Sequence, residues 1–355
     1  MKAREALVAL RTGRYSLVPN VPIPGIEPGE MLCKVRAVAL NPVDWKVIDL
    51  SASPDAIGGY DFAGEVIEVS SCVSRFKVGD RILAMTFGTN PLRLASGAFS
   101  NVAIATEDLA CKVPEWMSFQ QASSMAVAIA TAGLALHRTM GIPISTEMEH
   151  GGAQPKNPFF VLVSGGATAT GTVAIQLLKA CGAVPIATCS PQNSTLVKLA
   201  GAVETFDYRS PTCGIEISAY TNNTLSLVLD CVTEAASMKL CYEAIGPTGG
   251  HYVALDPFPT NIQYTRRDVR AESIMALTLF GGEVALDGAY GYPADPTARP
   301  FARRIFLMAE QLLGDRRLIP HPIEVRLGGL EGVKTGIEDL RRGGVRATKL
   351  VYPLS

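Results

Sequence analysis

Charged and apolar residues alternate along short segments in the first third of the chain. Residues 31–40 show this alternation, which is typical of strands with one buried face. Residues 61–69 form a second expected strand, opened by Gly58 and Gly59. A Val-Gly-Asp-Arg turn at 78–81 leads into a third expected strand, 82–85. The dipeptide at Asn41 and Pro42 is expected to break the first strand and open a loop. Because glycine and proline separate these short strands, they predict a barrel-like antiparallel domain.

The hydrophobic pattern changes near residue 120 and predicts helices and parallel strands in the rest of the chain. Residues 119–136 suit a helix with small residues on one face. From residue 159 onward, continuous apolar runs alternate with helical segments, and such runs are typical of parallel strands covered on both faces. This alternation predicts right-handed βαβ crossovers and a doubly wound sheet. The expected strands are 159–163, 184–188, 225–230, 251–255 and 349–352, and the expected helices are 172–181, 301–313 and 330–341.

Length and charge narrow the class of protein. A chain of 355 residues is long for one hydrophobic core, so two domains are expected. The net charge of -1, without any block of like charge, argues against nucleic acid as a partner. Residues 117–136 and 157–178 lack charge and are long enough to span a bilayer, but their glutamines, serines and glycines favour buried elements. Since the charged N-terminal residues contain no apolar segment of signal-peptide length, a cytoplasmic protein is expected.

A glycine-rich turn between an apolar strand and a helix is the strongest chemical signal. Residues 159–178 read FFVLVSGGATATGTVAIQLL, with Gly165, Gly166 and Gly171 in the turn. Such a turn lets backbone N–H groups approach a pyrophosphate, and the N-terminus of the following helix attracts its charge. The strand before the turn and the helix after it supply the context that a dinucleotide-binding motif requires. The alternative is a tight turn without a ligand.

The second strand of this region bears on the choice of cofactor. An NAD site places Asp or Glu near the end of that strand, where it binds the ribose hydroxyls. Here the strand is followed by Cys189 and by Ser-Pro-Gln-Asn-Ser at 190–194, without an acid. Lys198 and Arg209 are the nearest cations. The small polar groups leave room for a 2′-phosphate, which favours NADPH; the alternative is a polar loop without phosphate preference.

Several motifs resemble those of the medium-chain dehydrogenase/reductase superfamily, and the match covers nearly the whole chain. Residues 41–46 (NPVDWK) resemble the Asn-Pro-x-Asp signature of the quinone reductase type, and 59–64 (GYDFAG) resemble the Gly-x-Asp-x-x-Gly strand that follows it. More narrowly, residues 188–191, 206–209 and 249–253 are similar to those of the trans-acting enoyl reductases of fungal polyketide biosynthesis, the lovastatin-pathway type. That subgroup shares the threonine-rich turn, in which Thr168 stands where most relatives of the superfamily carry glycine.

The resemblance implies an α/β fold with a GroES-like β-rich catalytic domain and a Rossmann doubly wound domain that binds NADPH. The expected boundaries are 1–128 for the first part of the catalytic domain, 129–297 for the Rossmann domain, and 298–355 for the return to the catalytic domain. It also implies a monomeric enzyme that reduces an α,β-unsaturated thioester on the carrier domain of a partner polyketide synthase. Residues 285–300, with three prolines, are expected to cover the sheet edge at which many superfamily members dimerise.

Two alternative functions stay open from the sequence. One is a free-standing NADPH reductase of quinones or enones, and the other is a non-catalytic NADPH-binding or scaffold protein. A surface that meets an acidic carrier partner would be basic, and the candidate clusters are Arg266, Arg267 and Arg270, and Arg303 and Arg304. Solvated arginines without a partner are the alternative for both clusters.

The resemblance also implies the residues of the site. Lys46 and Thr131 are the catalytic candidates, because the matching positions of relatives approach the nicotinamide. A solvated surface lysine and a hydroxyl bonded within its own helix are the respective alternatives. The implied cofactor-binding residues are Val43, Asp44, Trp45, Lys46, Gly165, Thr168, Ala169, Thr170, Gly171, Ser190, Pro191, Gln192, Asn193, Ser194, Tyr208, Asp256, Pro257, Arg346 and Ala347. The implied substrate-binding residues are Ala132, Gly133, Leu134, Ala135, Leu136, His137, Leu279, Phe280, Gly281, Gly282 and Glu283.

A metal site is not expected. Zinc-dependent relatives carry Gly-His-Glu where this chain has Gly-Tyr-Asp, ending in Tyr60 and Asp61, and their first cysteine ligand falls near Asn41. Catalytic zinc needs about three protein ligands, and none of the four histidines lies in the matching segments. Tyr60 is interpreted as a packing residue. His251, in an expected buried strand, is interpreted as a core histidine with its hydrogen bonds satisfied.

Overall fold

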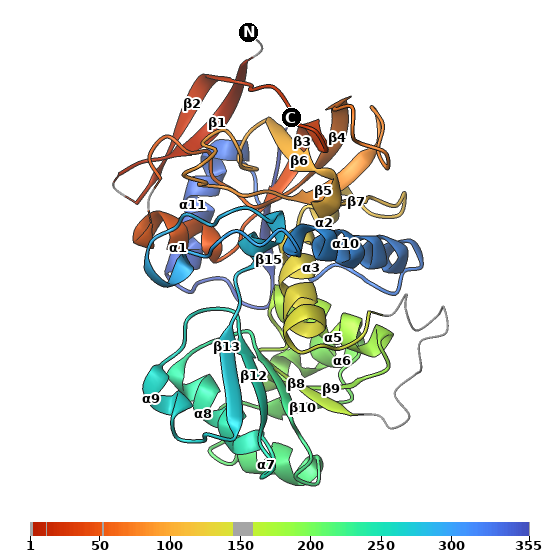
Figure 1. Cartoon of the computed structure of the whole chain (residues 1–355), viewed down its shortest axis with the longest axis vertical. Helices are drawn as coiled ribbons and strands as arrows, with labels where there is room; N and C mark the ends of the chain where they lie inside the picture. Colours follow the sequence, from red (N-terminus) through yellow and green to blue (C-terminus); the bar gives the residue numbers. More distant parts are fainter. Residues whose placement is uncertain (1–2, 12, 52, 145–158, 355) are drawn as a thin grey trace. The chain divides into compact units, whose positions relative to one another are not determined.

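The computed structural model describes residues 3–11, 13–51, 53–144 and 159–354 (Figure 1). The chain forms two compact units, one made of residues 1–130 and 277–355 and the other of residues 131–276. The first division falls two residues after the expected boundary at 128. The second falls at 276, whereas the sequence places the expected boundary at 297. The reason is that the parallel sheet ends with strand β13, Val269–Ser273, and the chain leaves the second unit soon afterwards.

The first unit is built around a seven-stranded sheet. The strand order is β14-β15-β3-β4-β5-β7, with β6 paired to β3, and every pairing except β14 with β15 is antiparallel. The expected β-rich domain is confirmed. The strands are β3 (Glu30–Ala39), β4 (Asp61–Val69), β5 (Arg81–Met85), β6 (Val102–Thr106), β7 (Ala110–Lys112), β14 (Ile323–Val325) and β15 (Lys349–Pro353). A separate two-stranded sheet joins β1 (Ala3–Ala9) to β2 (Tyr15–Pro22), two strands that the sequence pattern did not indicate.

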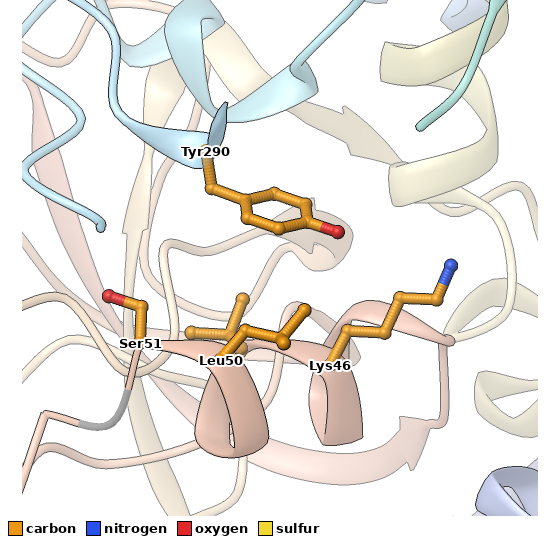
Figure 2. A pocket seen from close by; sticks show the side chains of 5 residues that line it. Lys46, Leu50, Ser51 and Tyr290 are labelled. Carbon is orange, nitrogen blue, oxygen red and sulfur yellow. The ribbon is translucent and has the colours of Figure 1, made fainter. Parts of the chain in front are cut away.

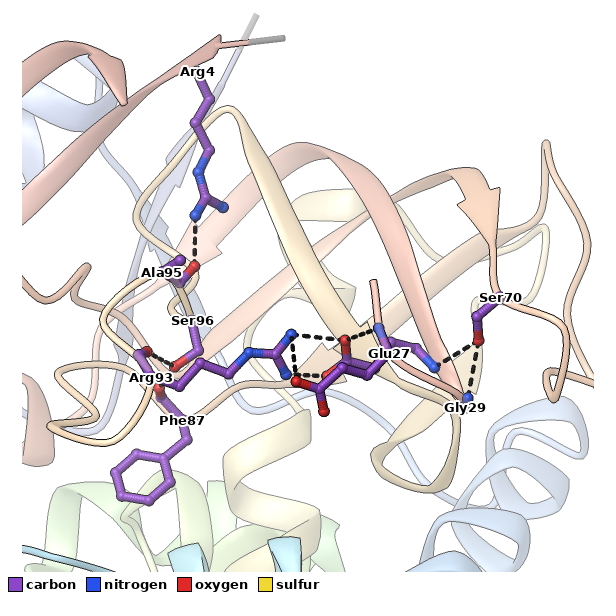
Figure 3. A network of polar contacts seen from close by, with 9 residues as sticks. Arg4, Glu27, Gly29, Ser70, Phe87, Arg93, Ala95 and Ser96 are labelled. Atoms are coloured by element: carbon purple, nitrogen blue, oxygen red, sulfur yellow. Dashed lines mark hydrogen bonds and ion pairs between the residues drawn. The ribbon is translucent and has the colours of Figure 1, made fainter. Parts of the chain in front are cut away.

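A polar network ties β1 to the loop that follows β5 (Figure 3). The guanidinium of Arg4, only 2% exposed, donates to the carbonyl oxygens of Ala95 at 2.5 Å and Val102 at 2.7 Å. In the same loop Arg93 donates to the carboxylate of Glu30 at 2.8 Å. Burial, with the nearby charge of Arg93, lowers the pKa of Arg4 to about 10. The two carbonyl oxygens replace the hydration of the buried guanidinium of Arg4, which is the condition under which such a charge is tolerated.

The expected loop after β3 is instead a helix. Helix α1, Val43–Leu50, begins directly after Pro42, which occupies the N-cap position. Proline suits the start of a helix because the first N–H groups have no partner within the helix and the fixed φ of proline is already helical. Asn41 and Pro42 therefore end the strand as expected, but they also start the helix that carries Lys46. The other helical elements of this unit are η1 (Glu107–Leu109), α2 (Phe119–Ala122), η4 (Ala276–Phe280), η5 (Gly288–Tyr290), α10 (Ala298–Gly314) and α11 (Gly329–Arg341).

The single helix expected at 119–136 is divided into three parts. A capping box between Ser118 and Gln121 starts α2, the helix α3 spans Ala126–Gly133, and a π-helical segment, η2, follows at Leu134–Thr139. Taken together, Phe119–Thr139 is long and apolar enough to cross a membrane by length and composition. Since 72% of its most apolar window is buried, it packs as a core helix of the protein.

The second unit contains the expected doubly wound sheet. Its six strands are all parallel, in the order β10-β9-β8-β11-β12-β13. They are β8 (Phe160–Ser164), β9 (Val184–Cys189), β10 (Glu204–Asp207), β11 (Leu227–Asp230), β12 (Gly250–Ala254) and β13. The helices are α5 (Ala169–Ala180), η3 (Pro191–Asn193), α6 (Ser194–Ala200), α7 (Cys213–Tyr220), α8 (Ala235–Ala244) and α9 (Thr260–Gln263). The chain reverses its direction across the sheet between β8 and β11, and ligands of such sheets bind at that point, outside the carboxyl ends of the strands.

The expected cover for the sheet edge lies in a different unit from the sheet. Residues 285–300 belong to the first unit, where a bridge between Val284 and Tyr292 closes the start of the segment. The outer strand β13 belongs to the second unit. The monomeric state therefore stays a prediction, based on the resemblance.

Candidate active site

The glycine turn after β8 has the geometry that a dinucleotide site needs. Gly165 has φ of +76°, and a Cβ on it would stand 2.7 Å from Cγ2 of Val232. A Cβ on Gly171 would stand 2.5 Å from the carbonyl oxygen of Gly165. Because these distances leave no room for a side chain, only glycine fits at both positions. The turn therefore brings bare backbone to the switch point of the sheet, where a pyrophosphate can approach it closely.

Thr168 has a structural role that the sequence did not reveal. It is the N-cap of α5, and its hydroxyl oxygen accepts a hydrogen bond from the backbone N–H of Gly171 at 2.9 Å. The N–H groups of Ala169 and Thr170, in the first turn of the helix, have no partner within the helix. These N–H groups and the positive end of the helix dipole suit the charge of a pyrophosphate. Threonine in place of glycine thus fixes the start of the helix and leaves the anion site intact.

A buried aspartate holds the loop that faces this turn. Asp230, at the end of β11, is fully buried. Its carboxylate accepts hydrogen bonds from the backbone N–H groups of Val232 at 3.0 Å and Thr233 at 3.2 Å. It also accepts from the hydroxyls of Ser237 at 2.7 Å and Tyr252 at 2.8 Å. Four donors to one carboxylate fix the position of Val232 against Gly165. An aspartate at the end of an expected strand is the sequence signal that could have indicated this role.

The loop after β9 combines small hydroxyl groups with exposed residues. Ser190 is 6% exposed, and its hydroxyl oxygen accepts from the side-chain amide of Asn193 at 3.0 Å. Pro191 and Gln192 are exposed, and Ser194 lies within 2.7 Å of the hydroxyl of Thr205. These hydroxyl and amide groups form two hydrogen-bonded pairs that follow the carboxyl end of the strand.

The sequence indicates two nearby cations, Lys198 and Arg209, and no acid after β9, but the charged groups around this loop are arranged differently. Lys198 forms an ion pair with Glu204 at 2.7 Å, and that contact lowers the pKa of Glu204. Asp207 pairs with Cys189 in the parallel register, so an acid lies on the neighbouring strand even though none follows β9 itself. The carboxylate of Asp207 accepts from the backbone N–H of Arg209 at 3.1 Å. Arg209, whose guanidinium lies 5.4 Å from the centroid of the Tyr208 ring, remains a cation at this edge.

The expected cofactor residues of the second unit converge on one edge of its sheet. The turn at 165–171 follows β8, the loop at 190–194 follows β9, Tyr208 follows β10, and residues 256–257, Asp256 and Pro257, follow β12. Parallel strands place their carboxyl ends on the same edge, so these segments lie together. Tyr208 is 49% exposed, which leaves an aromatic surface available there. This arrangement fits a dinucleotide.

In the first unit, Lys46 lines a small pocket beside α1. The other lining residues are Val47, Leu50, Ser51 and Tyr290 (Figure 2). The ammonium of Lys46 lies 5.8 Å from the centroid of the indole ring of its neighbour Trp45. Lys46 is half-buried. An ammonium that reaches a pocket wall is a hydrogen-bond donor for an oxygen that carries negative charge.

A buried ion pair anchors the helices around this site. The ammonium of Lys349, with its side chain 4% exposed, lies 2.5 Å from the carboxylate of the fully buried Asp61. It also donates to the carbonyl oxygen of Ser124 at 3.0 Å. The carboxylate of Asp61 accepts from the side-chain amide of Asn41 at 2.9 Å and from the backbone N–H of Val127 at 2.8 Å. The pair thus joins β4 and β15 to the residue before Pro42 and to the start of α3, the helix that carries Thr131.

Asp44 belongs to the same buried group. It is fully buried, and its carboxylate accepts from the backbone N–H of Asn41 at 2.6 Å. Burial raises the pKa of the Asp44 carboxyl well above its usual range, although the bond from Asn41 acts in the opposite direction. The hydroxyl of Tyr15 donates to the carbonyl oxygen of Asp44 at 3.0 Å. Of the expected cofactor residues 43–46, Asp44 therefore contributes by fixing the first turn of α1, while the side chains of Val43, Trp45 and Lys46 are half-buried.

The position that holds histidine in zinc-dependent relatives is occupied by a packed tyrosine. Tyr60 is fully buried, and its hydroxyl lies 2.6 Å from that of Thr89. Burial raises the pKa of this phenol, so it stays protonated at neutral pH. Within residues 3–11, 13–51, 53–144 and 159–354, no group of three or more His, Cys, Asp or Glu side chains could hold a metal ion. The chemistry of the described donors therefore does not fit a catalytic zinc site.

The expected substrate residues fall into two sets. In the second unit, Thr131 is half-buried, whereas residues 132–137 (Ala132, Gly133, Leu134, Ala135, Leu136 and His137) are buried in the helical core. In the first unit, Leu279 is buried and Phe280 packs against Phe87 with ring centroids 5.9 Å apart. Gly281, Gly282 and Glu283 are half-buried or exposed. The expected cofactor residues Arg346 and Ala347, which precede β15, are also half-buried or exposed.

Several of the remaining candidates have structural partners. His251, on β12, makes a short hydrogen bond through Nε2 to the carboxylate of Glu272 on β13, but it is half-buried rather than a core residue. Arg266 donates to the carbonyl oxygens of Tyr242 at 3.0 Å and Ile245 at 2.6 Å, at the end of α8. Arg266 thus stabilises a helix terminus rather than belonging to a free basic patch. In the other cluster, Arg303 lies 3.6 Å from Asp108.

Comparison with protein families matches both units. The alcohol dehydrogenase GroES-like domain matches residues 27–115, and the zinc-binding dehydrogenase domain matches residues 169–290. A trans-enoyl reductase of Gibberella fujikuroi is 53% identical over 351 residues, which cover 99% of this chain and 99% of that protein. The trans-enoyl reductase grgB of a Penicillium species is 47% identical over 350 residues, covering 99% and 98% of the two chains.

Solved structures show the same fold at lower identity. An alcohol dehydrogenase superfamily protein from Novosphingobium aromaticivorans matches with a TM-score of 0.77 and 22% identity, over 100% of both chains. The CurK enoyl reductase matches with a TM-score of 0.74 and 16% identity, also over 100% of both chains. At these identities the similarity concerns the fold alone.

Proposed function

This chain belongs to the medium-chain dehydrogenase/reductase superfamily and, within it, to the trans-enoyl reductases, and from that premise we propose that it uses NADPH to reduce the conjugated C=C bond of a polyketide thioester. The observation that carries the proposal is the match to trans-enoyl reductases over 99% of the chain at 53% identity. A glycine turn and its neighbouring loops, gathered at one sheet edge, support a dinucleotide. The thioester is carried by a partner polyketide synthase, and both act in the cytoplasm.

The second unit would hold the cofactor. When bound, NADPH supplies the hydride that goes to the β-carbon of the substrate. The N-terminus of α5, with the N–H groups of Ala169 and Thr170, would hold the pyrophosphate. Ser190 and Asn193 would hold the 2′-phosphate, and Tyr208 would contact the adenosine.

Lys46 is assigned to the developing negative charge on the thioester oxygen. A positioned donor lowers the barrier most when it points at the atom that gains charge in the transition state. The backbone of the helix that carries Lys46 is held in its first turn by the bond from the N–H of Asn41 to the carboxylate of Asp44, so the side chain would start from a fixed position. Thr131 would serve as a second donor near the reacting atoms. A group from the protein or water delivers the proton to the α-carbon.

The enzyme should prefer NADPH clearly over NADH. The small polar residues after β9 accept a 2′-phosphate, whereas an acid there would repel it. Ser190→Asp should therefore raise the KM for NADPH by more than the KM for NADH, and Ser190→Asn is the matched neutral control. The measurement is kcat/KM for both cofactors in each variant. Equal kcat/KM values for the two cofactors in the wild-type enzyme would contradict the assignment.

Activity should survive removal of metal ions. The mechanism relies on an ammonium and hydroxyl donors, and the described residues offer no cluster of metal ligands. Dialysis against a strong chelator should leave kcat within about twofold of its starting value, since no step depends on a Lewis acid. Elemental analysis accompanies the assay. Stoichiometric zinc, lost together with activity and restored with it, would overturn the metal-free mechanism.

The reaction class is tested by offering the enzyme and NADPH a panel of acceptors. The panel consists of short enoyl thioesters, free quinones and simple enones, and the oxidation of NADPH is followed by absorbance. Reduction of enoyl thioesters with the highest kcat/KM supports the proposal. Efficient reduction of quinones with poor activity on every thioester would instead assign the chain to small-molecule reduction.

A further inference from the structure

A second pocket, larger than the space beside α1, lies wholly within the second unit. It has a volume of about 450 Å³ and is open to solvent, and ligand pockets generally measure roughly 300–1,000 Å³. Tyr208, which is 49% exposed, forms part of its wall. The other lining residues come from the segment after β10 and from α7 and α8: Ser210, Pro211, Cys213, Gly214, Ala236, Lys239, Leu240 and Glu243. The pocket is therefore large enough for part of a nucleotide.

Tyr208 connects this pocket with the loop that is proposed to hold the 2′-phosphate. In the parallel register of β10 and β9, Asp207 lies opposite Cys189. The residues that follow on the two strands are Tyr208 and Ser190, and parallel strands place their ends at the same edge of the sheet. The pocket therefore adjoins the edge at which NADPH is expected to bind.

Helix α8 brings a lysine to this pocket from the end of β11. The carboxylate of Asp230, the last residue of β11, accepts from the hydroxyl of Ser237 at 2.7 Å and so holds the first turn of α8 at that edge. Lys239, two residues later, is exposed and lines the pocket. Glu243 lines it too, but its carboxylate lies against Gly214 on α7. In the described part of the chain no ion pair joins Lys239 to a carboxylate, so its charge is available to a ligand.

The charge of a 2′-phosphate gives this lysine a role. A phosphomonoester carries nearly two negative charges at neutral pH. The loop after β9 offers it neutral hydroxyl and amide groups, and Lys198 is already paired with Glu204 at 2.7 Å. Arg209, whose guanidinium lies 5.4 Å from the centroid of the Tyr208 ring, supplies one positive charge. A second cation would balance the phosphate, and Lys239 is the cation that the pocket provides.

We propose that Lys239 is a specificity-determining residue that binds the 2′-phosphate of NADPH from α8, together with the groups that follow β9. The inference rests on the proposed function. A lysine carries its charge on a flexible stem and binds phosphate as a point charge, so it needs no single fixed geometry. NADH lacks the 2′-phosphate and gains nothing from this contact. Lys239 therefore contributes to the choice between the two cofactors and leaves the hydride step unaffected.

The test measures binding of the adenosine end of the cofactor alone. The probes are adenosine 2′,5′-bisphosphate and adenosine 5′-monophosphate, which differ only in the 2′-phosphate, and calorimetric titration gives both Kd values. The wild-type protein should bind the bisphosphate more tightly. Lys239→Gln should reduce this preference by about three- to tenfold, the effect of one exposed ion pair with a group of nearly double charge. It should leave the Kd of the monophosphate unchanged, and Lys239→Arg should keep most of the preference because the charge remains.

Lys179→Gln is the matched control. Lys179 is an exposed lysine of the same unit, but it lies in the last turn of α5, at the opposite edge of the sheet, so its loss should keep the wild-type ratio of Kd values. A wild-type preference that survives unchanged in Lys239→Gln, or an equal loss in both variants, would overturn the inference alone. The absence of any wild-type preference, together with no oxidation of NADPH in the presence of enoyl thioesters, would contradict the proposed function as well.

Discussion

Lys349→Met should lower the free energy of unfolding by about 3–5 kcal/mol, the cost of leaving one partner of a buried ion pair without the other. The substitution strands the carboxylate of Asp61, which is fully buried and lies 2.5 Å from the lost ammonium. The amide of Asn41 and the N–H of Val127 still donate to it, but neither carries a full charge. The measurement is denaturant unfolding of the purified variant at neutral pH, with the slope checked for two-state behaviour.

Two further variants separate the buried pair from a general effect of losing a positive charge. Asp61→Asn combined with Lys349→Met removes both charges and should be less destabilised than Lys349→Met alone. Arg36→Met breaks an ion pair with Glu65 whose side chains are 32% and 36% exposed, and it should cost at most about 1 kcal/mol. Equal losses in Lys349→Met and Arg36→Met would show that burial of the pair contributes nothing.

Lys46→Ala should lower kcat with a short enoyl thioester by about 10²–10³, the usual effect of removing one preorganised donor. The reason is that Lys46 is assigned to the charge on the thioester oxygen, which develops in the transition state. Stability should change little, because the side chain is half-buried. Steady-state kinetics for the thioester and for NADPH give kcat and both KM values.

The pattern of constants distinguishes the possible roles of Lys46. A residue that only orients the cofactor would raise the KM for NADPH with a small loss of kcat. Lys334→Ala is the control, since Lys334 is a lysine on α11 that pairs with Glu331 on the same helix. If Lys46→Ala matches Lys334→Ala in every constant, Lys46 is a surface lysine and the charge-stabilising role is wrong.

Much of the fold could be predicted from the sequence because local pattern decides it. The strand at 61–69 was predicted with its observed bounds, and the closing strand at 349–352 was predicted to within one residue. The glycine turn was predicted because a strand, a turn and a helix follow one another directly in the chain. Each of these elements depends on residues that are close in sequence, so hydrophobic period and turn chemistry suffice to indicate them.

The failures concern features that depend on distant residues or on a choice between two local outcomes. The start of α1 after Pro42 was interpreted as a loop, because proline both ends strands and begins helices. The pair of Asp61 with Lys349 joins residues 288 positions apart, and no pattern in a single sequence links them. Tyr290 also lines the pocket of Lys46, although the whole second unit separates the two residues in the sequence. The sequence thus offered Lys46 as a candidate, but it indicated neither the Asp61–Lys349 pair nor Tyr290.

The central claim is that hydride passes from NADPH to the β-carbon of an enoyl thioester at this site. The most direct measurement uses NADPH that carries deuterium at the transferred C4 position, with an enoyl thioester in ordinary water, and locates the label in the product. The account predicts one deuterium at the β-carbon and an ordinary hydrogen at the α-carbon, with the double bond reduced. A saturated product without deuterium at the β-carbon, or no saturated product while quinones are reduced, would contradict it.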